Sequence, residues 1–569
     1  MFKLFRNLKA IDYLYLVMAV GLIVLQSYID LTIPDYTEKI IGETDMNTIL
    51  VNGGIMLAMS ISGLVCAILI GLLTALVAED LGYILRRRIY TKIQSFSLAE
   101  MNKFSTSSLM TRTTNDIRQV IVMIAIGTKS LIRAPIMSIY AISKVTNVGW
   151  QWSLATAVAL VLLITMIVTV MSLVIPKFKK MQTLTDNLNR VTRENLTGIR
   201  VVRASNAEEF EGQKFEKSND ELTKTNLFTG KVLSFFDPVM SLIMGGLSLV
   251  IYWLAAYLVG SVEMMKSVAI LSQYTTQVIM SFMMLIFVFM MLPRALVSVR
   301  RINEVLDSKN EIASGTFKDV LDGTATVVFE NVSFKYPGAD DYVLKDISFT
   351  ANEGETVAFI GSTGSGKSTI INLIPRLYDV TEGKVVIDGV DVREYDLEAL
   401  NRKIGYIPQK SVLFSGTVKS NVNFGDNDAS DETIKQAISI AQASNFVGRM
   451  EGGVDGRIAQ GGTNISGGQK QRLSIARAVA RKPEIFIFDD SFSALDYKTD
   501  KKLRSALKKH TTKVTKFIVA QRIGTIKDAD KIIVLENGEM VGMGTHEVLL
   551  RTCPVYQEIA LSQLSKEEL

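Results

Sequence analysis

The sequence predicts an all-α transmembrane domain of six helices with long cytosolic extensions, fused to an α/β domain. Two observations predict this arrangement. Residues 11–293 carry six apolar stretches, whereas residues 320–569 have the composition of a globular α/β domain. In that second part a Gly-rich loop, Gly361–Ser368, follows an apolar run, and a later apolar run, IFIFD, ends at Asp489. A strand that leads through such a loop into a helix is typical of phosphate binding.

The composition fits a membrane protein and argues against two other classes. The chain has 569 residues, of which 48% are hydrophobic, and its mean hydropathy is +0.26. The net charge of +5 is modest, so we expect no nucleic-acid partner, which would require clustered basic residues. Two cysteines, Cys66 and Cys553, do not make a disulfide framework. So low a cysteine content is consistent with a reducing cytosol around the α/β domain.

Each of the six apolar stretches is long enough to cross a bilayer as a helix, which takes about 20 residues. They lie at about 11–33, 52–78, 131–148, 152–175, 234–260 and 269–292. The third is the weakest, because Arg133 and Lys144 interrupt it. A buried core helix would explain one such stretch, but no soluble core needs six. We therefore predict a transmembrane domain at 1–310, a linker at 311–325, the α/β domain at 326–562 and a tail at 563–569.

Loop charges predict the orientation in the membrane. Residues 81–129 contain eight Lys or Arg and two acidic residues, whereas residues 34–50 contain four acidic residues and one Lys. Because Lys and Arg accumulate on the cytosolic side, residues 81–129 are predicted to be inside. Six spans then leave both termini and the α/β domain in the cytoplasm. The long inside stretches, 81–129 and 176–233, have apolar residues at helical spacing, so the membrane helices should extend into the cytosol.

The Gly-rich loop fits the pattern G-x-x-x-x-G-K-[ST] of a P-loop. Glycines let the backbone approach an anion, and the loop N–H groups with the following helix N-terminus attract phosphate. Lys367 is expected to reach the β- and γ-phosphates of ATP, and Ser368 to bind Mg²⁺ with Asp489. A chance Gly/Ser loop is the alternative, and the flanking strand and helix argue against it. The expected ATP-binding residues of the loop are Gly361, Ser362, Thr363, Gly364, Ser365, Gly366, Lys367, Ser368 and Thr369.

Further motifs resemble those of ATP-binding cassette (ABC) proteins. The stretch ISGGQ at 465–469 resembles the signature motif, which P-loop proteins of other families lack. By this resemblance Tyr336 would stack on adenine, and Gln409 would contact Mg²⁺ together with Ser368 and Asp489. The segment SALD at 493–496 matches the loop that crosses between paired domains. The stretches KFSTSSLMTRTTNDI and NRVTRENLTGIRVV look like intracellular loops of exporters, so the chain resembles an ABC exporter half-transporter.

The resemblance implies a dimer in which each ATP lies between the P-loop of one chain and the signature of the other. The signature residues Ser466, Gly467, Gly468 and Gln469 would then serve the ATP of a partner. Two hydrolytic positions depart from the family pattern, because Asp490 replaces the usual Glu and Gln521 the usual His. Aspartate draws the carboxylate back by about 1.5 Å, one C–C bond, and glutamine cannot carry a proton at pH 7. Gln460 replaces a Glu that is common upstream of the signature.

An altered site beside an intact signature favours a heterodimer, because a homodimer would have two impaired sites. The expected partner is a second, homologous half-transporter that carries the intact Glu and His. The chain would then be the degenerate-site subunit of a bacterial multidrug exporter in the cell membrane. It would bind ATP and Mg²⁺ but hydrolyse ATP poorly in its own site. Neutral drift in an active homodimer, a lipid or peptide exporter, and an ATP-gated channel or regulatory subunit are the alternatives.

The substrate is the least determined property. The sixth stretch is rich in Met and Phe, side chains that suit amphipathic compounds but also ordinary packing against lipid. Polar residues inside membrane helices are costly and often functional. The candidates for lining a substrate cavity are Gln26, Asp30, Asp237, Gln273 and Gln277. Of these, Asp30 and Asp237 would attract a cationic substrate.

Overall fold

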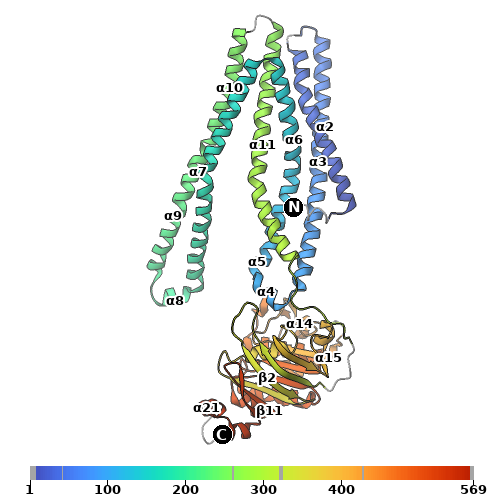
Figure 1. Cartoon of the computed structure of the whole chain (residues 1–569), viewed down its shortest axis with the longest axis vertical. Coiled ribbons are helices and arrows are strands. Elements are labelled where there is room, and N and C mark those ends of the chain that lie inside the picture. Colours follow the sequence, from blue (N-terminus) through green and yellow to red (C-terminus); the bar gives the residue numbers. More distant parts are fainter. Residues whose placement is uncertain (1–7, 42, 259–261, 319–324, 426–428, 564–569) are drawn as a thin grey trace. The chain divides into compact units, whose positions relative to one another are not determined.

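The computed structural model describes residues 8–41, 43–258, 262–318, 325–425 and 429–563. The chain forms two compact units (Figure 1). The first unit comprises Met1–Ile93 and Ser107–Ser308, and the second comprises Gln94–Thr106 and Lys309–Leu569.

The described residues of the first unit form helices joined by short connections. Six of its helical segments are long and apolar enough to cross a membrane, which confirms the predicted six-helix domain. The main helices are α2 (Ala10–Ile40), α3 (Met46–Gln94), α6 (Ile117–Val148), α7 (Trp150–Thr197), α9 (Glu208–Ser234), α10 (Phe236–Leu258) and α11 (Val262–Leu306). Short segments join them: α5 (Thr106–Thr111), a π-helical turn (Arg112–Asp116) and α8 (Ile199–Ala204). Within this unit α2, α3, α6 and α11 run together, and α7, α9 and α10 form a second group (Figure 1), which shares a hydrophobic cluster with α6 and α11.

Several helices are much longer than a bilayer is thick. Helix α3 has 49 residues and α7 has 48. At 1.5 Å per residue each is about 70 Å long, against about 30 Å for the hydrocarbon core. The helices therefore extend well beyond the membrane, as predicted.

Two ion pairs explain how the third membrane helix tolerates its charged residues. Arg133 of α6 lies 2.6 Å from Asp30 of α2, and Lys144 lies 3.0 Å from Asp35. Asp30 therefore already has a cationic partner within this chain, and its attraction for a cationic substrate stays a prediction. The ion pair of Arg133 and Asp30 also shows that these two residues lie at the same depth in the membrane. The stretch 131–148 thus starts beside the end of the stretch 11–33, and the residues of α6 before 131 share the depth of the first span.

The second unit contains two main sheets. The larger sheet has six strands in the order β12–β11–β3–β10–β9–β6, and all its neighbouring pairs are parallel except β11–β12. Its strands are β3 (Thr356–Gly361), β6 (Ile404–Ile407), β9 (Ile485–Asp489), β10 (Thr515–Val519), β11 (Lys531–Glu536) and β12 (Glu539–Gly544). The smaller sheet is antiparallel, in the order β2–β1–β4–β5, with β1 (Val327–Phe334), β2 (Leu344–Ala351), β4 (Glu382–Ile387) and β5 (Val390–Asp391).

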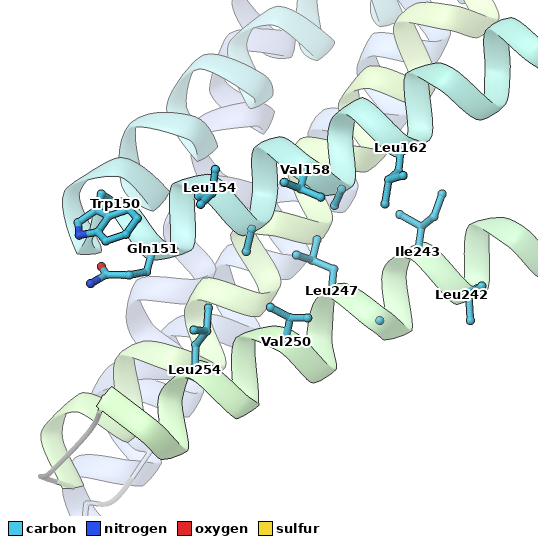
Figure 2. Close-up of a pocket in the computed structure, with 13 residues that line it drawn as sticks. Trp150, Gln151, Leu154, Val158, Leu162, Leu242, Ile243, Leu247, Val250 and Leu254 are labelled. Carbon is cyan, nitrogen blue, oxygen red and sulfur yellow. The ribbon is translucent and has the colours of Figure 1, made fainter.

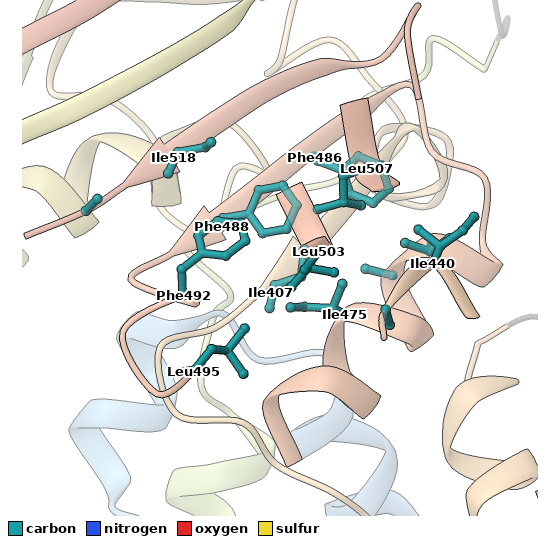
Figure 3. Close-up of a cluster of buried hydrophobic side chains, with 14 of the residues drawn as sticks. Ile407, Ile440, Ile475, Phe486, Phe488, Phe492, Leu495, Leu503, Leu507 and Ile518 are labelled. Carbon is teal, nitrogen blue, oxygen red and sulfur yellow. The ribbon is translucent and has the colours of Figure 1, made fainter. Parts of the chain in front are cut away.

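Alternating side chains divide the core of this unit between the two faces of the larger sheet. Phe486 and Phe488 of β9 join one hydrophobic cluster, with Leu503 and Ile475 from helices α18 (Tyr497–His510) and α17 (Gly467–Ala480) (Figure 3). Ile485 and Ile487 belong to a second cluster, which includes the smaller sheet. Strand β9 is therefore buried on both faces, as the run IFIF predicts.

Two segments outside the predicted α/β domain pack with it. Helix α4 (Leu98–Phe104) contributes Glu100, whose carboxylate accepts a hydrogen bond of 2.9 Å from the backbone N–H of Glu311. Asn102 donates to the Tyr378 hydroxyl at 3.3 Å. In the predicted linker, Phe317 pairs with Tyr395, whereas residues 319–324 lie outside the described residues. Residues 564–569 of the predicted tail also lie outside them.

Candidate nucleotide site

The P-loop connects the end of β3 to helix α12 (Lys367–Leu373). Its sharp turn requires glycine, because Gly364 and Gly366 have φ values of +86° and +96°, which side chains disfavour. A Cβ on Gly366 would also lie 2.6 Å from the end of the Leu344 side chain and 3.1 Å from the carbonyl of Val343, so a larger residue would require a shift there. The local sequence therefore forms the turn that phosphate binding needs.

Lys367 lies across this loop. Its ammonium donates hydrogen bonds to the carbonyls of Gly361 at 2.9 Å and Ser362 at 2.6 Å, and contacts the hydroxyl of Ser365 at 3.4 Å. Burial lowers the pKa of Lys367, and the nearby carboxylates of Asp490 and Asp489 oppose this shift. The cation is thus held beside the residues predicted to bind the phosphates.

The two strongest candidates for Mg²⁺ ligands lie side by side. Ser368 donates a hydrogen bond of 2.9 Å to Asp489, which is buried at the end of β9. Burial raises the pKa of Asp489. The described residues contain no group of three His, Cys, Asp or Glu that could hold a metal ion alone. A cation here would therefore depend on phosphate oxygens, as Mg²⁺ bound with ATP does, and the Ser368–Asp489 pair fits such a site.

Two further predicted residues of the site, Gln521 and Gln409, contact Asp490. Gln521 donates to its carboxylate at 3.0 Å, and Gln409, the third predicted Mg²⁺ ligand, donates to the same oxygen at 3.4 Å. Burial raises the pKa of Asp490. Its φ of +46° is unusual for a residue other than glycine. The two residues at the predicted hydrolytic positions, Asp490 and Gln521, are thus in direct contact.

Parallel strands explain why these residues meet. Val519 of β10 lies opposite both Phe359 of β3 and Asp489 of β9. The carboxyl ends of parallel strands form one edge of a sheet, where ligands bind in such folds. The P-loop, Asp489 with Asp490, and Gln521 all follow those ends.

The structure adds a residue that the sequence analysis missed. Gln563, in helix α21 (Pro554–Gln563), donates a hydrogen bond of 2.7 Å to the carbonyl of Gln521 and accepts one of 2.9 Å from the N–H of Ile523. It fixes the segment that carries Gln521. No local motif marks it, because it lies about 40 residues further along the chain.

Tyr336, the predicted adenine-stacking residue, is held by two contacts. Its hydroxyl shares a hydrogen bond of 3.0 Å with Thr369, and its ring packs edge-on against Tyr378, with ring centroids 5.2 Å apart. Both tyrosines line a cavity of about 510 Å³. Tyr378 was not predicted from the sequence.

The signature residues form the start of helix α17. The hydroxyl of Ser466 accepts a hydrogen bond of 3.4 Å from the N–H of Gln469, whose side chain accepts one of 2.9 Å from the N–H of Ser466. This reciprocal capping satisfies two N–H groups at the helix start. A Cβ built on Gly467 would meet no atom within 4 Å, whereas one on Gly468 would lie 3.2 Å from the carbonyl of Ala494. Gly467 therefore faces open space in this chain.

The first unit contains an apolar groove between α7 and α10 (Figure 2). Its volume is about 570 Å³. The lining is hydrophobic except for Gln151, with Trp150 near one end and Leu247 and Val250 along one side (Figure 2). Such a surface suits the apolar part of a ligand or of a lipid.

Comparison with known proteins identifies the family. Residues 13–292 match the ABC transporter transmembrane region, and residues 344–493 match the ABC transporter domain. The chain is 40% identical over 532 residues to an uncharacterized ABC transporter ATP-binding protein of Mycobacterium tuberculosis, covering 92% of this chain and 90% of the relative. The chain belongs to the ABC transporter family.

Other relatives agree in architecture. An uncharacterized ABC transporter ATP-binding protein of Bacillus subtilis is 37% identical, over 92% of this chain and 91% of its own length. Another Bacillus subtilis protein, whose name assigns it to multidrug resistance, is 31% identical over 84% of this chain and 82% of its own length. A bacterial Atm1-family ABC exporter solved with ATP bound has the same fold, with a TM-score of 0.77 at 24% identity and coverage of 97% and 99%. This chain thus joins one ABC transporter transmembrane region to one ABC transporter domain, and it is a multi-pass protein of the cell membrane.

Proposed function

We propose that this half-transporter exports amphipathic compounds as one half of a heterodimer, and that its own ATP site is degenerate. The contact between Asp490 and Gln521 carries the proposal. The neutral amide of Gln521 donates to one oxygen of the shortened carboxylate, and it can supply neither a proton nor a positive charge to the γ-phosphate at pH 7. The nucleotide-binding domain would lie on the cytoplasmic side, as the loop charges indicate.

The site would bind ATP well. The P-loop N–H groups and Lys367 would hold the phosphates, Tyr336 would stack on adenine, and Ser368, Gln409 and Asp489 would hold Mg²⁺. Bound Mg²⁺ would neutralise phosphate charge. Hydrolysis needs a base or positioning group near the attacking water and a donor for the γ-phosphate. A displacement of about 1 Å can cost on the order of 100-fold in rate, so Asp490 would position water poorly.

The signature would serve the other ATP of the complex. Ser466, Gly467, Gly468 and Gln469 lie at a capped helix start, with Gly467 open to a partner. The partner would be a homologous half-transporter with the usual Glu and His. Homodimers also occur among half-transporters, but two copies of this chain would place Asp490 and Gln521 in both sites.

The cargo would be an amphipathic compound, including drugs. The apolar groove between α7 and α10 and the relative named for multidrug resistance support this class. Export of a lipid uses the same kind of surface and is the second candidate. A peptide, whose backbone needs many hydrogen-bonding partners, fits the groove less well.

The test compares this chain alone with the chain plus a partner encoded in a neighbouring reading frame. Both preparations are reconstituted in vesicles, and ATP-dependent uptake of a fluorescent amphipathic dye is measured. We expect robust uptake only with the partner. Robust uptake by the solitary chain, at the rate of the pair, would contradict the heterodimer.

A further inference from the structure

The helices α2, α6 and α11 enclose a cluster of polar residues inside the membrane domain. Its anchor is the ion pair of Asp30 and Arg133, with 2.6 Å between the two charged groups. Gln277 of α11 donates to the backbone carbonyl of Asp30 at 3.5 Å. Three helices are therefore joined at this level by polar contacts.

A second cation lies beside this ion pair. Lys129 precedes Arg133 by four residues, so both lie on the same face of α6. Lys129 is half-buried and interacts electrostatically with both Arg133 and Asp30. Asp30 cannot neutralise two cations, and Lys129 has no hydrogen bond or ion pair of its own among the described residues. The cluster therefore holds one uncompensated positive charge.

Unpartnered polar atoms occur on the same three helices. The ion pairs show that α2 and α6 run in the same direction, because 30 pairs with 133 and 35 with 144. One helical turn before each member of the first pair lie Gln26 and Lys129. The Oε1 atom of Gln26, which is only 7% exposed, has no hydrogen-bond partner in the described structure. Two further buried atoms on these helices also have no hydrogen-bond partner in the described structure: Oγ of Ser138 and Oε1 of Gln277.

An uncompensated charge at Lys129 raises the free energy of the membrane domain unless a ligand of opposite charge binds to it. A charge inside a membrane helix is costly and marks a functional site by default. A structural ion-pair network would satisfy its own members, as Lys144 does with Asp35 and Tyr274 on the same helices. Lys129, by contrast, has no comparable partner among the described residues.

We propose that Lys129, Gln26 and Arg133 form a binding site for the anionic group of an amphipathic molecule, a carboxylate or a phosphate. Lys129 supplies the free charge, and Arg133, held by Asp30, supplies further N–H donors. The amide of Gln26 donates to the same anion through its NH₂ group. The inference deepens the proposed export function by naming a charge class for the cargo.

The test uses three probes with one tail: pyrene-labelled dodecanoate, the corresponding alcohol and the corresponding amine. Binding is measured by pyrene fluorescence without ATP, using the complex of this chain and its partner in nanodiscs of phosphatidylcholine. We expect the carboxylate to bind about tenfold tighter than the alcohol, as one charge-assisted hydrogen bond allows, and the amine to bind most weakly. Equal binding of all three, or tightest binding of the amine, would overturn the proposal.

Variants assign the effect to the cluster. Lys129→Gln should abolish the carboxylate preference, and Lys129→Arg should keep it. Lys180→Gln removes an exposed charge of α7 and is the matched control, which should bind like the wild type. A carboxylate preference that survives Lys129→Gln would overturn the assignment.

A second variant decides the question if Lys129→Gln does not fold. Gln26→Met replaces an unpartnered buried amide by an apolar side chain of similar length, so the melting temperature should stay or rise. Carboxylate binding should nevertheless weaken several-fold. A purely structural Gln26 would show the reverse, with a lower melting temperature and unchanged binding, and that result would overturn the proposal.

Competition distinguishes two sources of the anion. Displacement of the probe by phosphatidylglycerol in the nanodisc would assign the site to a lipid headgroup, and displacement by decyl phosphate alone would assign it to a free amphiphile. Because binding is measured without ATP, the two proposals fail separately. A complex that binds the carboxylate but exports nothing contradicts export, whereas one that exports a neutral dye but prefers no carboxylate contradicts this site.

Discussion

Gly467→Ala separates the two roles that the signature could have. A Cβ at this position would meet no atom of this chain within 4 Å, and Gly467 does not have a positive φ. Alanine should therefore fit at this first residue of α17 without a steric cost. The melting temperature of the isolated chain should be unchanged or slightly higher. In the complex, however, the methyl group would occupy space beside the partner's ATP, and turnover should fall by about 100-fold.

The assay is steady-state ATP hydrolysis by the complex, together with thermal melting of this chain. Gly212→Ala is the matched control, because it makes the same change at an exposed position of α9 where a Cβ also has no neighbour within 4 Å. It should not alter turnover. If the Gly467→Ala complex hydrolyses ATP as fast as the wild type, the signature does not serve a partner's site.

Three further outcomes are expected. Lys367→Ala should weaken ATP retention, measured with a fluorescent nucleotide, but slow turnover of the complex less than Gly467→Ala, because it would act on the site that we propose to be degenerate. Lys403→Met should lower the melting temperature by removing the partner of the buried Asp388, 2.8 Å away, at a cost of about 3–5 kcal/mol. Burial lowers the pKa of His546 below 6.5, so folding should lose stability as pH falls below 6.5, and in His546→Gln this contribution to the pH dependence of melting should disappear.

Much of the nucleotide site could be predicted from the sequence because its chemistry is local. The P-loop pattern fixes a turn and a helix start within eight residues, and the run before Asp489 has the length and composition of a doubly buried strand. The contact between Ser368 and Asp489 follows once both strands belong to one parallel sheet. The six apolar helices were predictable for the same reason, since bilayer thickness sets their length.

Contacts between distant segments could not be predicted in this way. The hydrogen bond from Gln521 to Asp490 depends on the positions of β10 and β9 and on the positive φ of Asp490. Gln563 reaches the site from another helix. The pairing of Arg133 with Asp30 depends on the relative depth of two helices, which hydropathy alone does not give.

The central claim is that this chain's own site binds ATP but hydrolyses it slowly. Single-turnover hydrolysis tests it most directly, in a complex whose partner's catalytic Glu has been changed to Gln so that only this chain's site reports. We predict slow hydrolysis with Asp490 and Gln521 in place, little gain from Asp490→Glu or Gln521→His alone, and a clear acceleration from both together if the partner's signature is competent. Hydrolysis in the unmodified site as fast as in the intact complex would show that the site is not degenerate.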